Sequence, residues 1–482
     1  MSENSEKQTI SRRKFTKAAG VTFGAALGFH FVPSRAWGNL EKPTLVGVGA
    51  GGKGKADLAG ANRAGFLVKA LVDIVDAKKL SSGQVGRRET SMVDVRKAYP
   101  DAQFFGDYRE MFEKLGDTID AVTVSCPDHH HFHATALAMK AGKHVYTQKP
   151  LTHGIWEARM LRELASRSNV KTQMGNQAHA NDHMRRCVEL IRAGVIGKVT
   201  AVHAWTNRPI WPQGFAVPPA KEAVPDGVDW NQWVGPAPWV DYSSKIAPFA
   251  WRGWWNFGTG ALGDMACHIM DMPYWALEPG APRSVIAEQN GATDLSPPIN
   301  SKITWDFGPN KYTADEGFKY HWYDGYVDAT FDRENWSLKK ASNDYNHPDE
   351  EVLEGMSFKD FGSVVIGEQG KLFFNRGRGG KWILKTQNTI DGFEWPEQSI
   401  PQAPGQDNYR EWFDAVTGKV EEGQSNFGLA GQLTETVLLG VLAQRVPDTK
   451  LEWDAKAMAV KGRPELKKFI QRPYRAGWEI DV

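Results

Sequence analysis

Three side chains of this sequence, Lys149, Asp264 and His268, have the chemistry needed to take a proton from a secondary hydroxyl group. Asp264 and His268 are four residues apart, so a helix that starts after the glycines at 258, 260 and 263 places both on one face. A carboxylate and an imidazole on one face can bind the same hydroxyl and pass its proton outward. Asp271 follows three residues later and could orient the imidazole ring. The alternative is structural: Asp264 begins the helix, and His268 is a buried histidine with satisfied hydrogen bonds.

Lys149 follows an apolar run, 144–147, that has the pattern of a buried strand, and Pro150 comes directly after it. A lysine held between a strand end and a proline is an unusual choice for the surface and a plausible base or proton relay. The alternative is a solvated surface lysine. Asp264 and His268 could instead join another histidine around a metal ion, but zinc sites use a tighter set of ligands. We therefore predict no metal site.

A glycine-rich turn stands between the β-branched run 44–48 and a predicted helix from about 53 to 64. Glycines with the spacing G-x-G-x-x-G allow a tight turn, a close approach of pyrophosphate to the backbone and close packing of helix on strand. The start of the helix would then bind the phosphates. The glycines predicted to contact the cofactor are Gly47, Gly49, Gly51 and Gly52. The alternative is a glycine-rich turn that binds nothing.

Asp73 ends the next predicted strand, 66–72, about twenty residues beyond the glycine turn. A carboxylate at this position accepts hydrogen bonds from the adenosine ribose of a dinucleotide. It also repels a 2′-phosphate. The sequence therefore predicts NAD, rather than NADP, as the cofactor.

Other chemically active residues follow later strands of this alternating α/β pattern. Strand 119–124 leads into Cys126-Pro127-Asp128, and ligands bind at the carboxyl ends of strands in doubly wound sheets. We therefore expect Pro127, His131 and Lys149 to face one crevice. The histidine cluster within 129–133 invites a metal interpretation, but we predict that His131 alone lies near the nicotinamide ribose. The other three histidines are expected to face solvent.

Several polar and aromatic residues are candidates for binding sugar hydroxyls or the apolar face of a sugar ring. Eight of the 19 tryptophans lie between 205 and 255, interleaved with Pro and Gly. Most are expected to pack in the core or in loops, and one or two could stack on a sugar. The predicted substrate-binding residues are Asn176, Gln177, His183, Arg252 and Trp255.

Composition narrows the class of partner. The 482 residues suffice for two or three domains with a large core. With 58 basic and 57 acidic residues, nothing indicates binding to nucleic acid or to an anionic membrane surface. Three scattered cysteines are too few for a disulfide framework and do not have zinc-site spacing.

The N-terminus carries the pattern of an export signal. Arg12-Arg13 resembles the twin-arginine motif, and the apolar stretch 18–32 is shorter than the roughly 20 residues that span a membrane. Small residues beyond it suit cleavage. We expect residues 1–38 to be a signal peptide read by the twin-arginine export machinery. The mature protein would be periplasmic or otherwise exported, without stable membrane insertion. The alternative is an ordinary basic tail before a short helix.

From about Lys42 onward the chain resembles the Gfo/Idh/MocA oxidoreductases, the relatives of glucose-fructose oxidoreductase and inositol dehydrogenase. The matching residues are Gly47–Gly52, Asp73, Pro127–His129, Ala141–Leu151 and Gly260–Asp271. The family's usual Glu-Lys-Pro is Gln148-Lys149-Pro150 here, which removes a negative charge beside the lysine.

The resemblance implies an α/β fold with an N-terminal Rossmann dinucleotide-binding domain, 42–168, and a C-terminal α/β domain, 169–482. The second domain would contain a large, mostly antiparallel open sheet, one face of which covers the nicotinamide. The stretch 362–374 has the pattern of a hairpin in that sheet. By this resemblance, Lys149, Asp264 and His268 would bind the substrate and transfer its proton. Relatives associate through the open sheet face, so a homo-oligomer, a dimer or tetramer, is implied.

Three functions are compatible with these features. The first is an NAD-dependent oxidoreductase that acts on a secondary hydroxyl of a sugar, polyol or glycoside. The second is an NAD-dependent glycoside hydrolase that works by transient oxidation, elimination, hydration and re-reduction. The third, a non-catalytic sugar-binding protein, is disfavoured because the proton-transfer residues are present. NAD is not freely available outside the cytoplasm, so an exported enzyme is expected to hold its cofactor tightly.

Overall fold

The computed structural model describes residues 42–80, 90–356, 360–375, 381–386 and 396–482. The predicted signal peptide, 1–38, lies outside the described residues and stays a prediction. In the part of the chain that is described, no helix has both the length and the apolar character needed to cross a membrane.

Six parallel strands form the N-terminal sheet, in the order β3-β2-β1-β4-β5-β6. The strands are β1 (Thr44–Val48), β2 (Leu67–Val72), β3 (Gln103–Phe105), β4 (Ala121–Val124), β5 (His144–Gln148) and β6 (Thr172–Gly175). The helices between them are α1 (Lys53–Ala64), α2 (Thr90–Ala98), α3 (Tyr108–Leu115), α4 (Asp128–Lys140) and α5 (Ile155–Ser166). The strand order reverses between β1 and β4, which is where doubly wound sheets bind their ligands. The sheet includes β6 and therefore continues past the domain boundary predicted at residue 168.

The second sheet has nine strands, in the order β15-β14-β13-β7-β10-β9-β8-β16-β17. They are β7 (Val199–Thr206), β8 (Ser284–Asn290), β9 (Asn300–Phe307), β10 (Phe318–Asp324), β13 (Phe361–Gly367), β14 (Gly370–Asn375), β15 (Lys381–Thr386), β16 (Leu451–Asp454) and β17 (Ala459–Val460). Only the β7–β10 pair is parallel. The predicted Rossmann domain with a mostly antiparallel second sheet is therefore confirmed. The expected hairpin at 362–374 is β13–β14.

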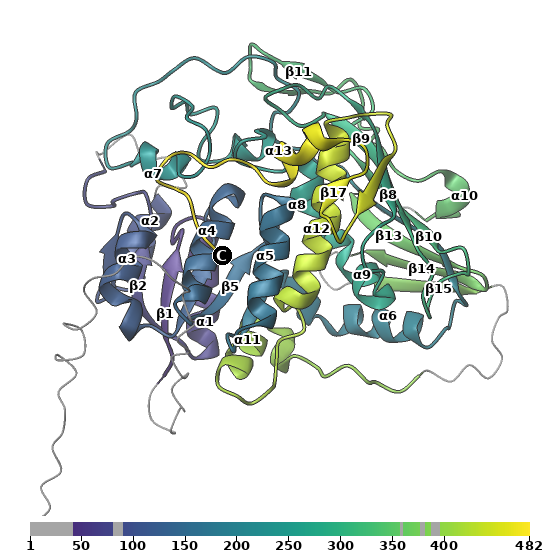
Figure 1. Ribbon diagram of the computed structural model, residues 1–482, viewed down its shortest axis with the longest axis horizontal. Coiled ribbons are helices and arrows are strands. Elements are labelled where there is room, and N and C mark those ends of the chain that lie inside the picture. The colour runs from purple at the N-terminus through teal and green to yellow at the C-terminus, as the bar shows by residue number, and fades with distance from the viewer. Residues whose placement is uncertain (1–41, 81–89, 357–359, 376–380, 387–395) are drawn as a thin grey trace, which may run out of the picture. The chain divides into compact units, whose positions relative to one another are not determined.

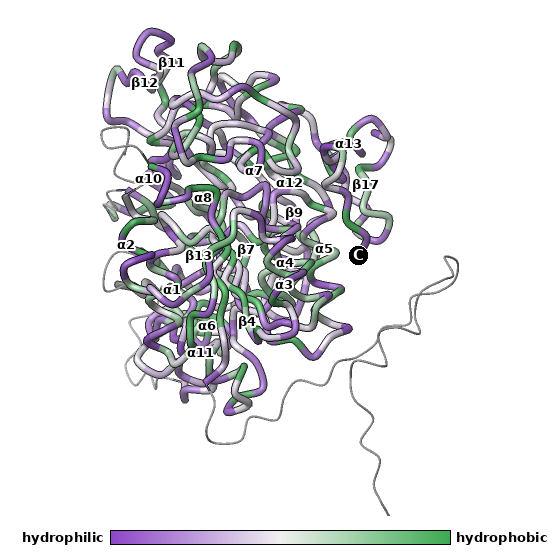
Figure 2. The backbone as a smooth tube through the Cα atoms, turned by 90° about the vertical axis from the view of Figure 1, so that its left-hand side faces the viewer, coloured by the Kyte–Doolittle hydropathy of each residue, from purple (hydrophilic) through white to green (hydrophobic). Residues whose placement is uncertain are grey.

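Helices cover one face of the nine-stranded sheet and join it to the N-terminal sheet. They are α6 (Asp182–Arg192), α8 (Gly260–Ile269), α9 (Asp271–Leu277) and α12 (Phe427–Gln444). Helix α12 packs against α5 on one side and against α8, β8 and β9 on the other, as Figure 1 shows. It is apolar nearly all round because protein surrounds it. Figure 2 shows hydrophobic residues concentrated along inner strands such as β4 and β7, and hydrophilic ones on the outlying hairpin of β11 (Thr330–Asp332) and β12 (Ser337–Lys339).

The C-terminal segment returns from α13 (Lys467–Ile470) past α7 (Trp230–Val234) to the Rossmann helices (Figure 1). Glu157, which is buried in the first turn of α5, holds this segment in place. Its Oε1 accepts hydrogen bonds from Arg472 Nε at 2.8 Å and Tyr474 OH at 2.9 Å. Its Oε2 accepts one from the backbone of Gly154 at 2.8 Å. Burial disfavours the charged carboxylate, but Arg472, His153 and His133 together outweigh burial and lower the pKa of Glu157 to about 2.

The depressed pKa of Glu157 makes the stability of the protein acid-sensitive. The carboxylate contributes fully above its ordinary pKa of 4.5, and the contribution is lost as the pH falls toward 2. The difference corresponds to roughly 3 kcal/mol at neutral pH. We expect Glu157→Gln to lower the melting temperature at pH 7 and to flatten its dependence on pH between 5 and 2. Thermal unfolding of both proteins across that range checks this, and identical pH profiles would contradict it.

Candidate active site

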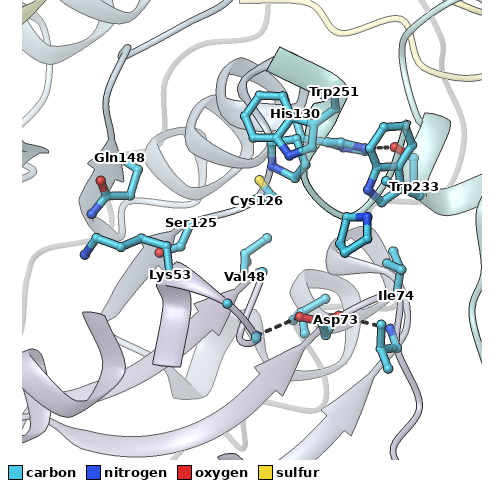
Figure 3. Close-up of a pocket in the computed structure, with 18 of the residues that line it drawn as sticks. Val48, Lys53, Asp73, Ile74, Ser125, Cys126, His130, Gln148, Trp233 and Trp251 are labelled. Carbon is cyan, nitrogen blue, oxygen red and sulfur yellow. Dashed lines mark hydrogen bonds between the residues drawn. The ribbon is translucent and has the colours of Figure 1, made fainter. Parts of the chain in front are cut away.

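One cavity of about 740 Å³ joins the glycine turn to residues of the C-terminal domain. It lies at the carboxyl ends of the parallel strands, at the position where the strand order reverses. The predicted site residues that line it are Gly49, Gly51, Gly52, Asp73, Pro127, His131, Lys149, Gln177, Arg252 and His268. In Figure 3, Lys53, Ser125 and Gln148 lie on one side of this cavity and Trp233, Trp251 and His130 on the other.

The glycine turn has the geometry of a phosphate cradle, but its register differs from the predicted one. Strand β1 ends at Val48, and Gly49 follows with φ +73°. A Cβ atom on Gly49 would lie 2.5 Å from the backbone of Cys126, and one on Gly54 would lie 1.9 Å from the carbonyl of Gly49. The spacing that the backbone requires is therefore Gly49-x-Gly51-x-x-Gly54, which also satisfies G-x-G-x-x-G. Gly47 instead makes room for Leu58 of α1.

Asp73 is tied to the glycine turn by hydrogen bonds. The backbone of Gly51 donates to its Oδ2 at 2.8 Å, and the backbone of Val75 donates to its Oδ1 at 3.0 Å. Burial raises the pKa of Asp73 despite these amide donors. At Gly52, which lines the cavity, a Cβ atom would meet no protein atom within 4 Å. The turn therefore leaves open space beside the start of α1, as a pyrophosphate group requires.

Lys149 and Asp264 meet across the two domains, as the sequence predicts for a shared site. Lys149 Nζ donates to Asp264 Oδ1 and to the backbone oxygen of Asp264, each at 2.8 Å. Arg252 Nε donates to the same Oδ1 at 2.8 Å. Burial opposes the charge on Asp264, but Lys149 and then Arg252 outweigh it and lower its pKa to about 2. Asp264 is therefore a carboxylate that holds the lysine in position.

His268 lies on the same helix as Asp264 and lines the cavity. Its Nδ1 is 2.7 Å from Asn176 Oδ1, and Asn176 Nδ2 donates to the carbonyl of Cys267 at 2.7 Å. The second contact turns the amide oxygen toward the ring, so Nδ1 of His268 carries the hydrogen in this pair. The prediction that Asp271 orients this ring is wrong, because Asp271 pairs with buried His179 at 2.9 Å. Asn176 holds His268 instead.

The histidines of α4 are buried, so the expectation that three of them face solvent is wrong. His129 Nε2 and His130 Nε2 lie 2.8 and 3.0 Å from the carbonyl of Trp233. His133 Nε2 lies 2.9 Å from the carbonyl of Trp478. Burial lowers the pKa of His130 to about 3 and that of His133 to about 4, which keeps both rings neutral. Buried carbonyls need donors, and these imidazoles supply them.

His131 lines the cavity, but backbone atoms engage both of its ring nitrogens. Nδ1 lies 2.7 Å from the carbonyl of Pro150, and Nε2 lies 2.8 Å from that of Cys126. His131 therefore joins the loop after β4 to the loop after β5, next to Lys149. Throughout the described residues, no group of three or more His, Cys, Asp or Glu side chains could hold a metal ion.

The predicted substrate-binding residues divide into two groups. Gln177 and Arg252 line the cavity, and Gln177 Nε2 donates to Tyr146 OH at 3.1 Å. His183 lies in the exposed first turn of α6, beside exposed Asp182, and does not line the cavity. Trp255 is buried under the guanidinium of Arg445, with its indole NH donating to the carbonyl of Thr293 at 2.8 Å. Packing accounts for Trp255, and nothing places His183 near the cavity.

A buried carboxylate that sequence analysis missed, Asp57, connects the site to α1. Ser125 Oγ and Gln148 Nε2 donate to its Oδ2 at 2.6 and 2.9 Å. Tyr409 OH donates to its Oδ1 at 2.7 Å, and Lys53 Nζ contacts the same oxygen. The negative charge absent at Gln148 is thus present on Asp57. Only the four-residue step from Lys53 to Asp57 along one helix face could have indicated this contact in the sequence.

Comparison with known proteins agrees with this architecture. Residues 44–176 match the model of the oxidoreductase family with an NAD-binding Rossmann fold, and residues 189–293 match that family's C-terminal alpha/beta domain. The scyllo-inositol 2-dehydrogenase (NADP(+)) of Bacillus subtilis is 25% identical over 49% of this chain and 55% of its own length. The D-xylose 1-dehydrogenase (NADP(+)) of Hypocrea jecorina is 33% identical over 25% of this chain and 30% of its own length. The chain thus spans about a third to a half of the length of the curated relatives it matches.

A solved structure shares the fold over most of both chains. The WlbA dehydrogenase of Bordetella pertussis, in complex with NADH and UDP-GlcNAcA, superposes with a TM-score of 0.56 at 14% identity. The superposition covers 86% of this chain and 99% of that one. Residues 44–176 and 189–293 thus match the two domains of the Gfo/Idh/MocA oxidoreductase family, and the first of them is an NAD-binding Rossmann domain.

Proposed function

We propose that this protein oxidises a secondary hydroxyl of a sugar, polyol or glycoside by hydride transfer to a tightly held NAD. The observation that carries the proposal is a single cavity that joins the glycine turn and Asp73 to Lys149, Arg252 and His268. The inositol and xylose dehydrogenases among the relatives act on substrates of this class. Asp73 supports NAD over NADP, because its carboxylate would repel a 2′-phosphate.

NAD would be held by the glycine turn and Asp73, and when bound it supplies the hydride acceptor. Lys149 has three N–H donors, two of which Asp264 already engages, so one remains for a substrate oxygen. His268, held by Asn176 at the edge of the cavity, would take up the hydroxyl proton. Lys149 would stabilise the negative charge that develops on the oxygen as this proton leaves. Arg252 and Lys149 together keep Asp264 ionised throughout.

A redox-neutral glycoside hydrolase is the second candidate, favoured by the twin-arginine pattern at Arg12-Arg13. It begins with the same oxidation and then eliminates the leaving group, adds water and reduces the ketone. The same residues would serve that first step. An exported protein cannot rely on free NAD, so in both cases the cofactor should stay bound.

Incubation of the purified protein without added cofactor tests both candidates. We expect about one NAD(H) per chain, measured by absorbance after denaturation. A panel of aryl glycosides and free sugars then separates the candidates. Release of sugar selects the hydrolase, and a keto-sugar that accumulates with an acceptor selects the oxidoreductase. Protein without nucleotide and with full dependence on added NAD would contradict tight binding.

We also propose export by the twin-arginine machinery to the periplasm and assembly into a dimer or tetramer through the open face of the nine-stranded sheet. Support comes from Arg12-Arg13 and from the family resemblance. Cell fractionation with and without Arg12→Lys/Arg13→Lys tests the first point. Light scattering of the purified protein tests the second.

A further inference from the structure

A segment of the C-terminal domain, residues 225–237, crosses the nucleotide end of the cavity. It pairs with the backbone directly after Asp73. The amide of Asp229 donates to the carbonyl of Ile74 at 2.9 Å, and the amide of Asp76 donates to the carbonyl of Gly227 at 2.8 Å. Val75 and Val228 form an antiparallel bridge between these two hydrogen bonds. The end of β2, where an adenosine ribose belongs, is therefore covered.

The inner side of this segment is aromatic. Trp230 and Trp233 stack with ring centroids 4.4 Å apart and planes 8° apart. Both are buried, and both line the cavity together with Val228. Tyr242 meets Trp230 edge to face at 5.1 Å. A flat apolar wall of this kind suits an aromatic ring system such as adenine.

Three elements outside the segment hold it in place. His129 and His130 of α4 hydrogen-bond the carbonyl of Trp233, as described above. Gln232 Nε2 donates to Asp107 Oδ2, in the loop before α3, at 3.1 Å. Arg475 of the C-terminal segment donates to the carbonyl of Asn231 at 2.9 Å. The buried histidines of α4 therefore help to fix the segment that carries both tryptophans.

We propose that residues 225–237 form an adenosine roof: a cover that encloses the adenine and its ribose, with Trp230 and Trp233 as the apolar wall beside the base. NAD cannot leave this end of the cavity without breaking the backbone pairing to residues 74–76. The roof is therefore the device that retains NAD between turnovers. The inference rests on the proposed function in taking NAD as the occupant.

Nucleotide exchange in the full-length protein tests the roof without any sugar substrate. Purified protein is mixed with excess isotopically labelled NAD⁺, and the bound nucleotide is separated and analysed over time. We expect Trp230→Leu and Trp233→Leu to speed exchange at least 10-fold. Gln232→Ala, which removes the tie to Asp107 and leaves both tryptophans in place, should speed it less. Val217→Ala is the control and should leave exchange unchanged, because Val217 lies eight residues before the roof, is 45% exposed and does not line the cavity.

Circular dichroism identifies the variants that remain folded, and Gln232→Ala serves if both tryptophan variants unfold. Folded variants that exchange NAD as slowly as the unaltered protein would overturn the roof and leave the proposed function standing. Faster exchange in Val217→Ala than in Trp230→Leu would overturn it as well. An unaltered protein that neither contains nor takes up NAD(H) would overturn both the roof and the proposed function.

Discussion

Replacing Lys149 by alanine is expected to lower kcat at least about 100-fold, the lower end of what removing one donor to a developing oxyanion costs. The variant should still bind NAD, because the glycine turn and Asp73 lie at the other end of the cavity. The lysine bridges the domains to Asp264 and has one donor left for the substrate oxygen. Without it, the charge that develops on that oxygen has no cation at this position. Single-turnover reduction of bound NAD, followed by absorbance, measures the step directly.

Two further variants make this prediction specific. Lys55→Ala removes an exposed lysine of α1 that pairs with Asp94 and does not line the cavity, and it should leave kcat unchanged. Asp264→Asn removes the carboxylate that fixes the lysine. Because the pKa of Asp264 is about 2, its charge is constant above pH 4, so any acid limb of the activity profile there should persist in Asp264→Asn. Near-normal activity of Lys149→Ala would remove Lys149 from the mechanism.

Local patterns in the sequence predicted the elements that carry the site. The β-branched run at 44–48 and the helix at 53–64 appear as β1 and α1, and the glycines before Asp264 begin α8. Strands, helices and the glycine turn are set by residues close together in the sequence. The placement of Asp264 and His268 on one helix face follows from their four-residue spacing in the same way. The Gly54 register could also have been read, since the glycines satisfy the motif twice.

Hydrogen-bond partners that lie far apart in the sequence could not be predicted from it. Asn176, expected to bind substrate, instead orients His268 from 92 residues away. The buried histidines looked solvent-facing because the carbonyls that need them belong to Trp233 and Trp478 in another domain. Hydrogen-bond demand at buried backbone atoms is set by tertiary packing, and no local pattern encodes it.

Gln148→Glu and Asp57→Asn are each expected to damage the site, and the two together are expected to restore it, because the pair moves one negative charge from α1 to β5. Gln148→Glu alone would place a second carboxylate against Asp57, whose oxygens already face Gln148 Nε2 at 2.9 Å and Ser125 Oγ at 2.6 Å. A buried charge without a partner costs about 3–5 kcal/mol, so we expect loss of bound NAD and at least a 10-fold fall in kcat. Asp57→Asn alone would leave Lys53 without its carboxylate and set the new amide NH2 against the donors at either Oδ1 or Oδ2.

The double variant Asp57→Asn/Gln148→Glu restores one amide and one carboxylate across the same contact. If Asp57 replaces the charge that relatives carry beside the lysine, this variant should recover most of the NAD content and kcat lost in either single variant. The four proteins form a double-mutant cycle, and a large favourable coupling in kcat and in NAD content is the expected result. Gln148→Met separates the causes, because it removes the hydrogen bond without adding charge and should cost less than Gln148→Glu. If the losses simply add in the double variant, Asp57 only packs α1 against the sheet. Its negative charge would then have no part in the work of Lys149.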